Sequence, residues 1–425
     1  MSLPTQIRKG SVIYFFAMLL LFVIAFGIQS AEIICIIQII SVLKLWYECR
    51  KSQLLLILTF FCSLYTIPPI INVFFKIELS AYSRFNNSES LYLPLVIHTL
   101  FIFIISCHCY CPKTTAHPLK ISSNDFSKYE SKSRYYLMLL CALLCMFLGK
   151  SGQTIFERQG YGQSGSSSSA IYEYFCFFFL LSAIFAGNNQ NKKYFLLGTA
   201  LLYAMKSLLY GGRVEVIQIL ILVFILYFQD KFHTGILLGG LIGGYILMTL
   251  IGNFRGGLQF DFDSFSQLLG YNMSRNRLVN NESDVWYASA VILASLKTTA
   301  VTTQYRVIAT IYYFIRLIVP SSLLNQTYNV VPYLQKYLTA FGGGGLFSAF
   351  LYFYFGAVGV ILGAILIGKM FQGATKNSQS IFLKIFLIQS FTMLPRWFAY
   401  SPEAICKTAF YAVFAFYLLT RVRLK

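Results

Sequence analysis

Charged residues are scarce in this chain of 425 amino acids. Asp, Glu, Lys and Arg together make up 12% of it, against about 25% in a typical soluble protein. Acidic residues are the scarcest, with 15 against 34 basic ones, so the formal net charge is +19. Hydrophobic residues supply 57% of the chain, and the mean hydropathy is +0.64. This balance excludes an ordinary soluble protein and favours a membrane protein with several spans.

The first apolar run lacks the small-residue cleavage site of a signal peptide, and a second run follows it almost at once. We therefore expect the first run to remain as a membrane helix. Further apolar runs approach the ~20 residues that a helical span needs. The predicted fold class is an all-α polytopic integral membrane protein with about twelve transmembrane helices. The expected spans are residues 11–29, 31–47, 53–75, 91–109, 134–149, 171–187, 194–210, 214–229, 234–251, 346–368, 380–395 and 403–420.

These spans divide the chain into three parts. Residues 1–251 hold the first nine transmembrane helices with short loops, residues 252–345 form one large outer loop, and residues 346–425 hold the last three helices. The segment 194–229 tests the count, because as one helix it would be roughly 54 Å long, against about 30 Å of hydrocarbon. We therefore predict a turn at Gly211-Gly212-Arg213, where glycines allow a tight turn and the arginine stays hydrated.

Basic residues predict the orientation of the spans. The pairs Arg8-Lys9 and Arg50-Lys51 precede spans one and three, and residues 421–425 are basic, so both termini are expected to be cytoplasmic. With this orientation lysine outnumbers arginine inside, whereas arginine outnumbers lysine outside. The positive-inside rule does not distinguish the two residues. Because the planar guanidinium fits phosphate and carboxylate, the arginine excess indicates anion recognition at the outer face.

The large loop is the expected site of chemistry, because a loop of this length without a function is uncommon. It carries five of the outer arginines and four acids, together with an apolar patch at 307–319. The patch is too short for a comfortable span, so we expect an interfacial or re-entrant helix. The arginines are Arg255, Arg275, Arg277, Arg306 and Arg316, and the acids are Asp261, Asp263, Glu282 and Asp284.

Other chemistry is weakly indicated. None of the ten cysteines lies in a predicted outer loop, so no disulfide framework is expected. "CHCYC" at 107–111 has the residue types of a metal site, but helical spacing would scatter its cysteines around the helix. "DFD" at 261–263 imitates the metal motif of nucleotide-sugar transferases, and on an outer face a polar loop is the better interpretation. No histidine lies in a predicted outer loop, which disfavours a histidine base.

Three stretches together resemble the O-antigen polymerase (Wzy) family of bacterial envelope-polysaccharide enzymes. They are "YGGRVEV" after a span, "FIRLIVPSSLL" in the long loop, and "AFGGGGLFSAFLYFYFGAVGVILGAILIGKM" opening the next span. The resemblance covers mainly residues 205–400. It matches Arg213 to the turn arginine, Arg255 to the arginine entering the large loop, Arg316 to the segment beside Pro320, and Arg396 to an arginine outside the penultimate span.

The resemblance implies an inverting, metal-independent glycosyltransferase with a GT-C-like fold, without cofactors, in the bacterial inner membrane. Such an enzyme moves a growing polysaccharide from undecaprenyl diphosphate onto a new lipid-linked repeat unit at the periplasmic face. The implied partners are that lipid-linked oligosaccharide, the bilayer, a chain-length regulator and a flippase, with no nucleic acid. Paired arginine-to-glycine spacings that mark some members are not clear in this chain.

The chemistry of the residues agrees with that implication. Fixed arginines can stabilise a diphosphate leaving group without a metal. The candidate catalytic residues are Arg213, Arg255, Asp261, Asp263, Glu282 and Asp284. The four acids are unranked as the base for the acceptor hydroxyl. Glu215 is a further candidate, or else it orients an arginine. The candidate substrate-binding residues are Arg213, Arg255, Arg275, Arg277, Arg306, Arg316 and Arg396.

Two rival functions stay open. A lipid-linked oligosaccharide flippase or other transporter also has about twelve spans, but it needs charges inside its bundle and no large outer loop. An O-antigen ligase shares the architecture of a polymerase, but it carries a histidine in its large loop, which this chain lacks.

The predicted orientation can be tested with reporter fusions. Fusions after Ser164 and Ser264 are expected to show periplasmic activity, and fusions after Ser122 and at the C-terminus cytoplasmic activity, because the lysine-rich short loops stay inside. A cytoplasmic result at Ser264 would remove the large loop from the outer face.

Overall fold

The computed structural model describes residues 9–79, 88–109, 123–151, 167–168, 170–209, 212–229, 231–255, 271–272, 276–298, 301–320, 323–337, 344–374 and 380–421. Over these ranges the chain is almost entirely helical, with five strands of two residues each. It forms two compact units that interleave along the sequence. Unit 1 comprises Met1–Thr114, Gly270–Ile311 and Gln326–Gly373, and unit 2 comprises Thr115–Leu269, Tyr312–Asn325 and Ala374–Lys425.

The helices and strands of unit 1 come from the N-terminal part of the chain, from the predicted large loop and from the long helix that follows this loop. They are α1 (Lys9–Gly27), α2 (Ala31–Cys49), α3 (Gln53–Leu64), α4 (Ile67–Phe75), β1 (Glu78–Leu79), α5 (Ser88–His108), β4 (Tyr271–Asn272), β5 (Arg277–Leu278), α13 (Asn281–Ser295), most of α14 (Thr303–Arg316), η6 (Gln326–Tyr328), α15 (Val330–Tyr337) and α16 (Phe347–Gly373).

Unit 2 is built from the middle of the chain and its C-terminal part. Its elements are α6 (Ser123–Lys128), α7 (Lys132–Leu148), β2 (Lys150–Ser151), β3 (Ser167–Ser168), η1 (Ala170–Tyr174), α8 (Phe175–Phe185), α9 (Gln190–Leu209), α10 (Arg213–Val223), the π-helical turn η2 (Phe224–Phe228), α11 (Thr234–Arg255), α17 (Ile381–Thr392), α18 (Leu394–Trp397), η7 (Pro402–Ile405) and α19 (Lys407–Arg421). The last residues of α14 also belong to this unit.

Every predicted span contains helix. Four helical segments of the described chain are long and apolar enough to cross a membrane, namely Gln53–Phe75, Leu91–His108, Phe347–Gly373 and Pro402–Arg421. Shorter apolar helices lie at Val12–Gly27, Ile171–Phe185, Thr234–Ile246 and Ile381–Thr392. The predicted all-α class is thereby confirmed, and the apolar helices are those of a multi-pass membrane protein. The count of twelve spans and the three-part division of the chain stay predictions.

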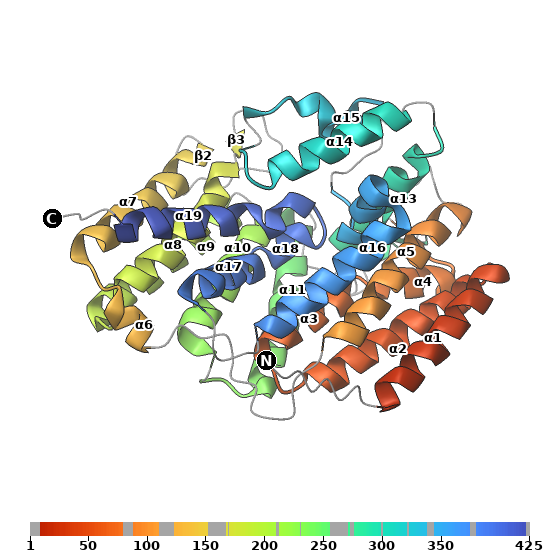
Figure 1. The fold of residues 1–425 in the computed structure, drawn as a ribbon, viewed down its shortest axis with the longest axis horizontal. Helices are drawn as coiled ribbons and strands as arrows, with labels where there is room; N and C mark the ends of the chain where they lie inside the picture. The colour runs from red at the N-terminus through yellow and green to blue at the C-terminus, as the bar shows by residue number, and fades with distance from the viewer. Residues whose placement is uncertain are drawn as a thin grey trace. The chain divides into compact units, whose positions relative to one another are not determined.

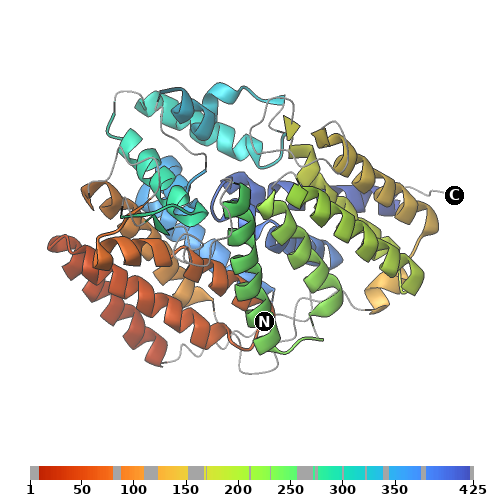
Figure 2. The ribbon, with the colours of Figure 1, turned by 180° about the vertical axis from the view of Figure 1, so that it is seen from behind.

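Helices α5, α16 and α2 form the core of unit 1. Figure 1 shows α1, α2 and α5 side by side, and Figure 2 shows the red pair α1 and α2 together again from behind. His98 on α5 is buried and lies 3.0 Å from the hydroxyl of Ser348 on α16, through its Nδ1 atom. Trp286 on α13 donates to the carbonyl of Tyr65, where α3 gives way to α4. These buried polar contacts fix the pairing of helices whose surfaces are otherwise apolar.

The large predicted loop is mostly helical where the structure describes it. Asn280 and Ser283 form a capping box, so α13 starts sharply, and nearly all its side chains are buried. The predicted helix at 307–319 is confirmed as part of α14, and Val307, Ile311 and Phe314 on it are exposed apolar residues. The buried side chains of α13 were missed by the sequence analysis, because the polar start "NNESD" looks like a surface loop.

Helix α16 is broken at Gly356, whose φ of 68° is in the left-handed region that glycine tolerates. A break leaves the preceding carbonyls without their intrahelical donors. Arg306 on α14 takes two of them, donating from Nε to Phe353 at 2.5 Å and from Nη2 to Tyr352 at 3.1 Å. Thr310 donates to the carbonyl of Tyr354. Arg306 therefore joins α14 to the break in α16.

Aromatic side chains fill the core of unit 2 between α8 and α9. Tyr203 stacks on Phe175 and on Tyr172, with ring centroids 4.1 and 4.5 Å apart. Each tyrosine hydroxyl of the Tyr172–Tyr203 pair donates to the backbone carbonyl of the other. Lys206, one turn further along α9, donates to the carbonyl of Met146 near the end of α7. Figure 1 shows α19 alongside α17, which closes the same unit.

Gly149 allows the end of α7 to approach the start of the α8 segment. A Cβ atom there would lie 2.5 Å from the backbone of Tyr172, so we expect Gly149→Ala to destabilise the protein by roughly 1–3 kcal/mol. Gly198→Ala on α9 is the matched control, because its Cβ would meet nothing within 4 Å. The midpoints of unfolding in detergent measure both, and equal midpoints for the two variants would contradict this packing.

Candidate functional site

An ion pair between Arg396 and Glu173 lies at the centre of a polar cluster in unit 2. Arg396 Nη2 is 2.5 Å from Glu173 Oε1. Gln218 on α10 donates from Nε2 to the other carboxylate oxygen at 3.4 Å and is itself fully buried. Glu173 is only 7% exposed. Three helical segments far apart in the sequence therefore converge on one carboxylate.

The local sequence explains why Arg396 is held there. Helix α17 ends at Thr392, and Pro395 starts the short helix α18, which carries the arginine. Trp397 is fully buried and donates its indole N–H to the carbonyl of Ser390. The tryptophan therefore fixes α18 against the end of α17 and directs its neighbour Arg396 toward η1 and α10.

Electrostatics keep this arginine charged. The carboxylate of Glu173 raises the pKa of Arg396 against the opposing effect of burial, and Glu215 adds to the increase. Glu215 also acts on Cys176 and Tyr203, which places it in the same cluster as Glu173. A guanidinium fixed by a carboxylate keeps N–H groups in a defined direction, as recognition of a second anion requires.

Arg213 starts helix α10, and Glu215 follows in its first turn. The predicted turn is confirmed, since α9 ends at Leu209 and α10 begins at Arg213, although Gly211 lies outside the described residues. A cation at a helix N-terminus opposes the helix dipole, at a typical cost of about 0.3–1 kcal/mol, whereas an acid there is favourable. Helix stability therefore explains Glu215 and does not explain Arg213.

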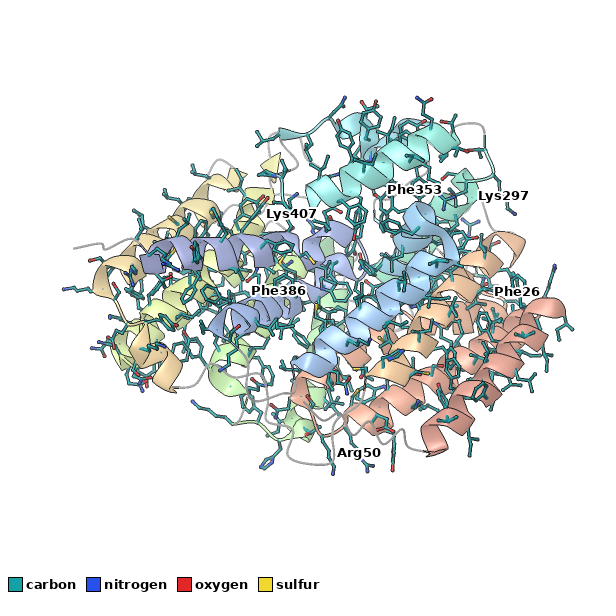
Figure 3. All side chains as sticks on the ribbon, viewed as in Figure 1. Phe26, Arg50, Lys297, Phe353, Phe386 and Lys407 are labelled. Carbon is teal, nitrogen blue, oxygen red and sulfur yellow. The ribbon has the colours of Figure 1, made fainter. Side chains whose placement is uncertain are left out.

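A second polar cluster of unit 2 joins the end of α14 to the start of α19. Arg316 and Lys407 are buried, and Lys407 interacts electrostatically with both Arg316 and Glu403. Burial, with the charge of Glu403, raises the pKa of Tyr313 on α14. Figure 3 shows Lys407 on α19. Two cations and one carboxylate thus gather around a buried tyrosine.

The other predicted site residues are not among the residues of these two clusters. Arg277 and Arg306 belong to unit 1, where Arg277 pairs with Glu78 at 2.6 Å across the parallel strands β5 and β1. Glu282 and Asp284 lie in the first turn of α13, also in unit 1. Arg255 is the last residue of α11, and Arg275, Asp261 and Asp263 lie outside the described residues.

Three polar residues of these clusters, and the way they come together, were not predicted from the sequence. Glu173, Gln218 and Glu403 were not named, although each lies in or beside an apolar run near a predicted outer helix end. Such a position is the available signal, because a polar residue inside a span is costly unless it is paired. The partners could not be inferred, since about half of the chain separates Glu173 from Arg396.

No group of three metal-ligating side chains occurs within the described ranges. The cysteines described there are free thiols. The cations, carboxylates and amides of unit 2 can instead hold an anion and orient a polar ligand by hydrogen bonds.

The chain matches no protein-family model, and comparisons with curated proteins and with solved structures find no match either.

The ion pair is expected to show energetic coupling. Glu173→Ala and Arg396→Ala should each destabilise unit 2, and the double variant should cost less than the sum by roughly 1 kcal/mol or more. The side chain of Arg396 is 34% exposed, so the coupling stays below the ~3–5 kcal/mol of a fully buried pair.

The matched control is the pair Lys192–Glu130, whose atoms are 3.4 Å apart at the surface of the same unit. Its coupling should be below ~1 kcal/mol. Unfolding midpoints in a detergent titration measure both cycles. Strictly additive effects at Glu173 and Arg396 would show that the pair is not a unit.

Proposed function

We propose that this protein polymerises lipid-linked oligosaccharide repeat units at the outer face of a bacterial inner membrane. In this proposal it transfers the growing glycan from undecaprenyl diphosphate onto a new repeat unit, as an inverting, metal-independent glycosyltransferase. Both termini are cytoplasmic and the active site is periplasmic. The resemblance of residues 205–400 to the O-antigen polymerase family is one support for it, and the composition of unit 2 is the other.

The observation that carries the proposal is the set of basic side chains that separate helices contribute to unit 2. Arg213, Arg316 and Arg396 come from three separate helices of that unit, and Lys407 lies beside one of them. The three arginines lie at helix ends that the predicted topology assigns to the outer face, and Lys407 lies within the predicted span 403–420. A departing diphosphate carries charge that such fixed cations can stabilise without a metal.

The carboxylates of unit 2 divide into two roles. Glu173 orients Arg396 and is a positioning residue, because its two oxygens already accept from Arg396 and Gln218. Glu215 and Glu403 join Asp261, Asp263, Glu282 and Asp284 as candidates for the base that accepts the proton of the acceptor hydroxyl. Glu215 is favoured by its position in the first turn of α10, two residues from Arg213.

A flippase or other transporter of lipid-linked oligosaccharides is the second candidate. It requires charges inside the helical bundle, and Lys206, Arg316 and Lys407 are indeed buried in unit 2. A deletion strain separates the two functions. Lipopolysaccharide with the core plus a single repeat unit supports a polymerase, whereas loss of all O-antigen points to a flippase or a ligase.

Arg213 gives the sharpest test of the proposed polymerase. If it makes a bidentate contact with the diphosphate, its loss should cost roughly 2–3 kcal/mol, a factor of about 30 to 150 in rate. We expect Arg213→Ala to nearly abolish long polymer and Arg213→Lys to reduce it strongly, at normal membrane abundance, since lysine lacks the planar fork.

The matched control is Arg421→Lys. Arg421 is an exposed arginine at the C-terminal end of α19, and its replacement by lysine should leave polymer length unchanged. Polymer of full length from Arg213→Lys at equal protein level would reduce Arg213 to an interfacial anchor, a role that lysine fills as well.

A further inference from the structure

Three basic side chains from three helices come together in unit 1, at the ends of α2, α5 and α16. Lys44 and Lys369 both act electrostatically on the imidazole of His108, the last residue of α5. His108 is half-buried, and Lys369 is exposed. This Lys44–His108–Lys369 cluster is separate from the residues assigned to the proposed polymerase, which the inference does not require.

Close helix packing fixes the cluster. Gly368 on α16 faces α5 so closely that a Cβ atom there would lie 2.8 Å from Cβ of His108. The contact places the adjacent Lys369 beside the end of α5. Lys44 Nζ lies 3.7 Å from the ring centroid of Tyr14 on α1, and the Tyr14 hydroxyl bonds to Ser41 and Ser106. The side chain of Lys44 and the backbone at Lys369 are therefore held in place before any ligand arrives.

Like charges held together are unfavourable unless an anion lies between them. Within the described residues neither Lys44 nor Lys369 has a carboxylate at ion-pair distance. The carboxylate of Glu48 acts on Lys44 electrostatically, with a smaller effect than that of burial. The helix dipole does not account for the two lysines, because it favours cations in the last turn of a helix, whereas Lys44 and Lys369 lie before the last turns of α2 and α16.

The surroundings are those of a membrane surface. Phe16 and Leu20 of α1 are 63% and 62% exposed, and they continue from Tyr14 along an apolar helix. Arg50, labelled in Figure 3, is exposed at the end of α2. Its guanidinium lies over the ring of Tyr47. Aromatic rings beside basic groups are typical of the headgroup level, and apolar side chains beyond them suit acyl chains.

We propose that the Lys44–His108–Lys369 cluster binds the phosphate of an anionic phospholipid headgroup. The two ammonium groups supply charge and several donors, and the imidazole supplies a further N–H. The exposed apolar face of α1 holds the acyl chains, which distinguishes a lipid from a free phosphate. Basic pockets between membrane helices bind acidic lipids in this way.

The test uses the purified full-length protein in zwitterionic detergent, titrated with phosphatidylglycerol or phosphatidylcholine in mixed micelles. Its thermal unfolding midpoint is the readout. Phosphatidylglycerol should raise the midpoint of the native protein and phosphatidylcholine should not. A lysine near an acidic surface contributes about 1 kcal/mol, so Lys369→Gln should raise the half-saturating phosphatidylglycerol content about fivefold, and Lys44→Gln with Lys369→Gln roughly thirtyfold.

Lys297→Gln is the matched control, because Lys297 is an exposed lysine of the same unit at the end of α13 (Figure 3). It should keep the native response, and so should Lys44→Arg, which preserves the charge. An unchanged response in Lys369→Gln, or equal stabilisation by phosphatidylcholine, would overturn the site. Equal stabilisation by millimolar inorganic phosphate alone would overturn the assignment to a lipid. If the double variant does not fold, the exposed Lys369→Gln decides alone.

Discussion

The carboxylate of Glu173 lies in an apolar helical unit, and the guanidinium of Arg396 makes that burial tolerable. A charged group removed from water costs several kcal/mol unless it is paired and hydrogen-bonded. The pair satisfies this condition with a direct contact and a third group, Gln218. The same contact joins η1, the first part of α10 and the short helix α18. Any site that uses Arg396 therefore depends on the carboxylate that orients it.

Interrupted helices supply the other polar contacts. Helix α16 breaks at Gly356, and the freed carbonyls accept from Arg306. The helical segment 53–75 breaks after Leu64, and the carbonyl of Tyr65 accepts from Trp286. In a low-dielectric surrounding each freed backbone group needs a partner, so a break fixes which side chain must lie beside it. The interruptions thus determine how α13 and the first part of α14 pack onto the apolar helices of unit 1.

The sequence was sufficient to predict the helices, because apolar runs of span length and the turn before Arg213 are local signals. It was insufficient for the breaks and for the site. The helix break at Gly356 lies inside an apolar run with no proline, and α13 is buried although it starts with a polar stretch. Glu173 and Gln218 appear in the sequence as isolated polar residues within apolar helices. Their convergence with Arg396 depends on contacts between distant segments, which periodicity does not encode.

The arginine excess of the predicted outer side has two separate causes. Arg277 and Arg306 in unit 1 have structural partners, a carboxylate across a strand pair and the carbonyls of a broken helix. The composition of the chain does not distinguish these two arginines from those of unit 2. A guanidinium that caps a helix break and one that holds a phosphate use the same donors. Arg396, by contrast, is fixed by Glu173 while its side chain stays one-third exposed. An arginine oriented from one side and open on another can still bind an anion, and that geometry, rather than the number of arginines, makes unit 2 the candidate site.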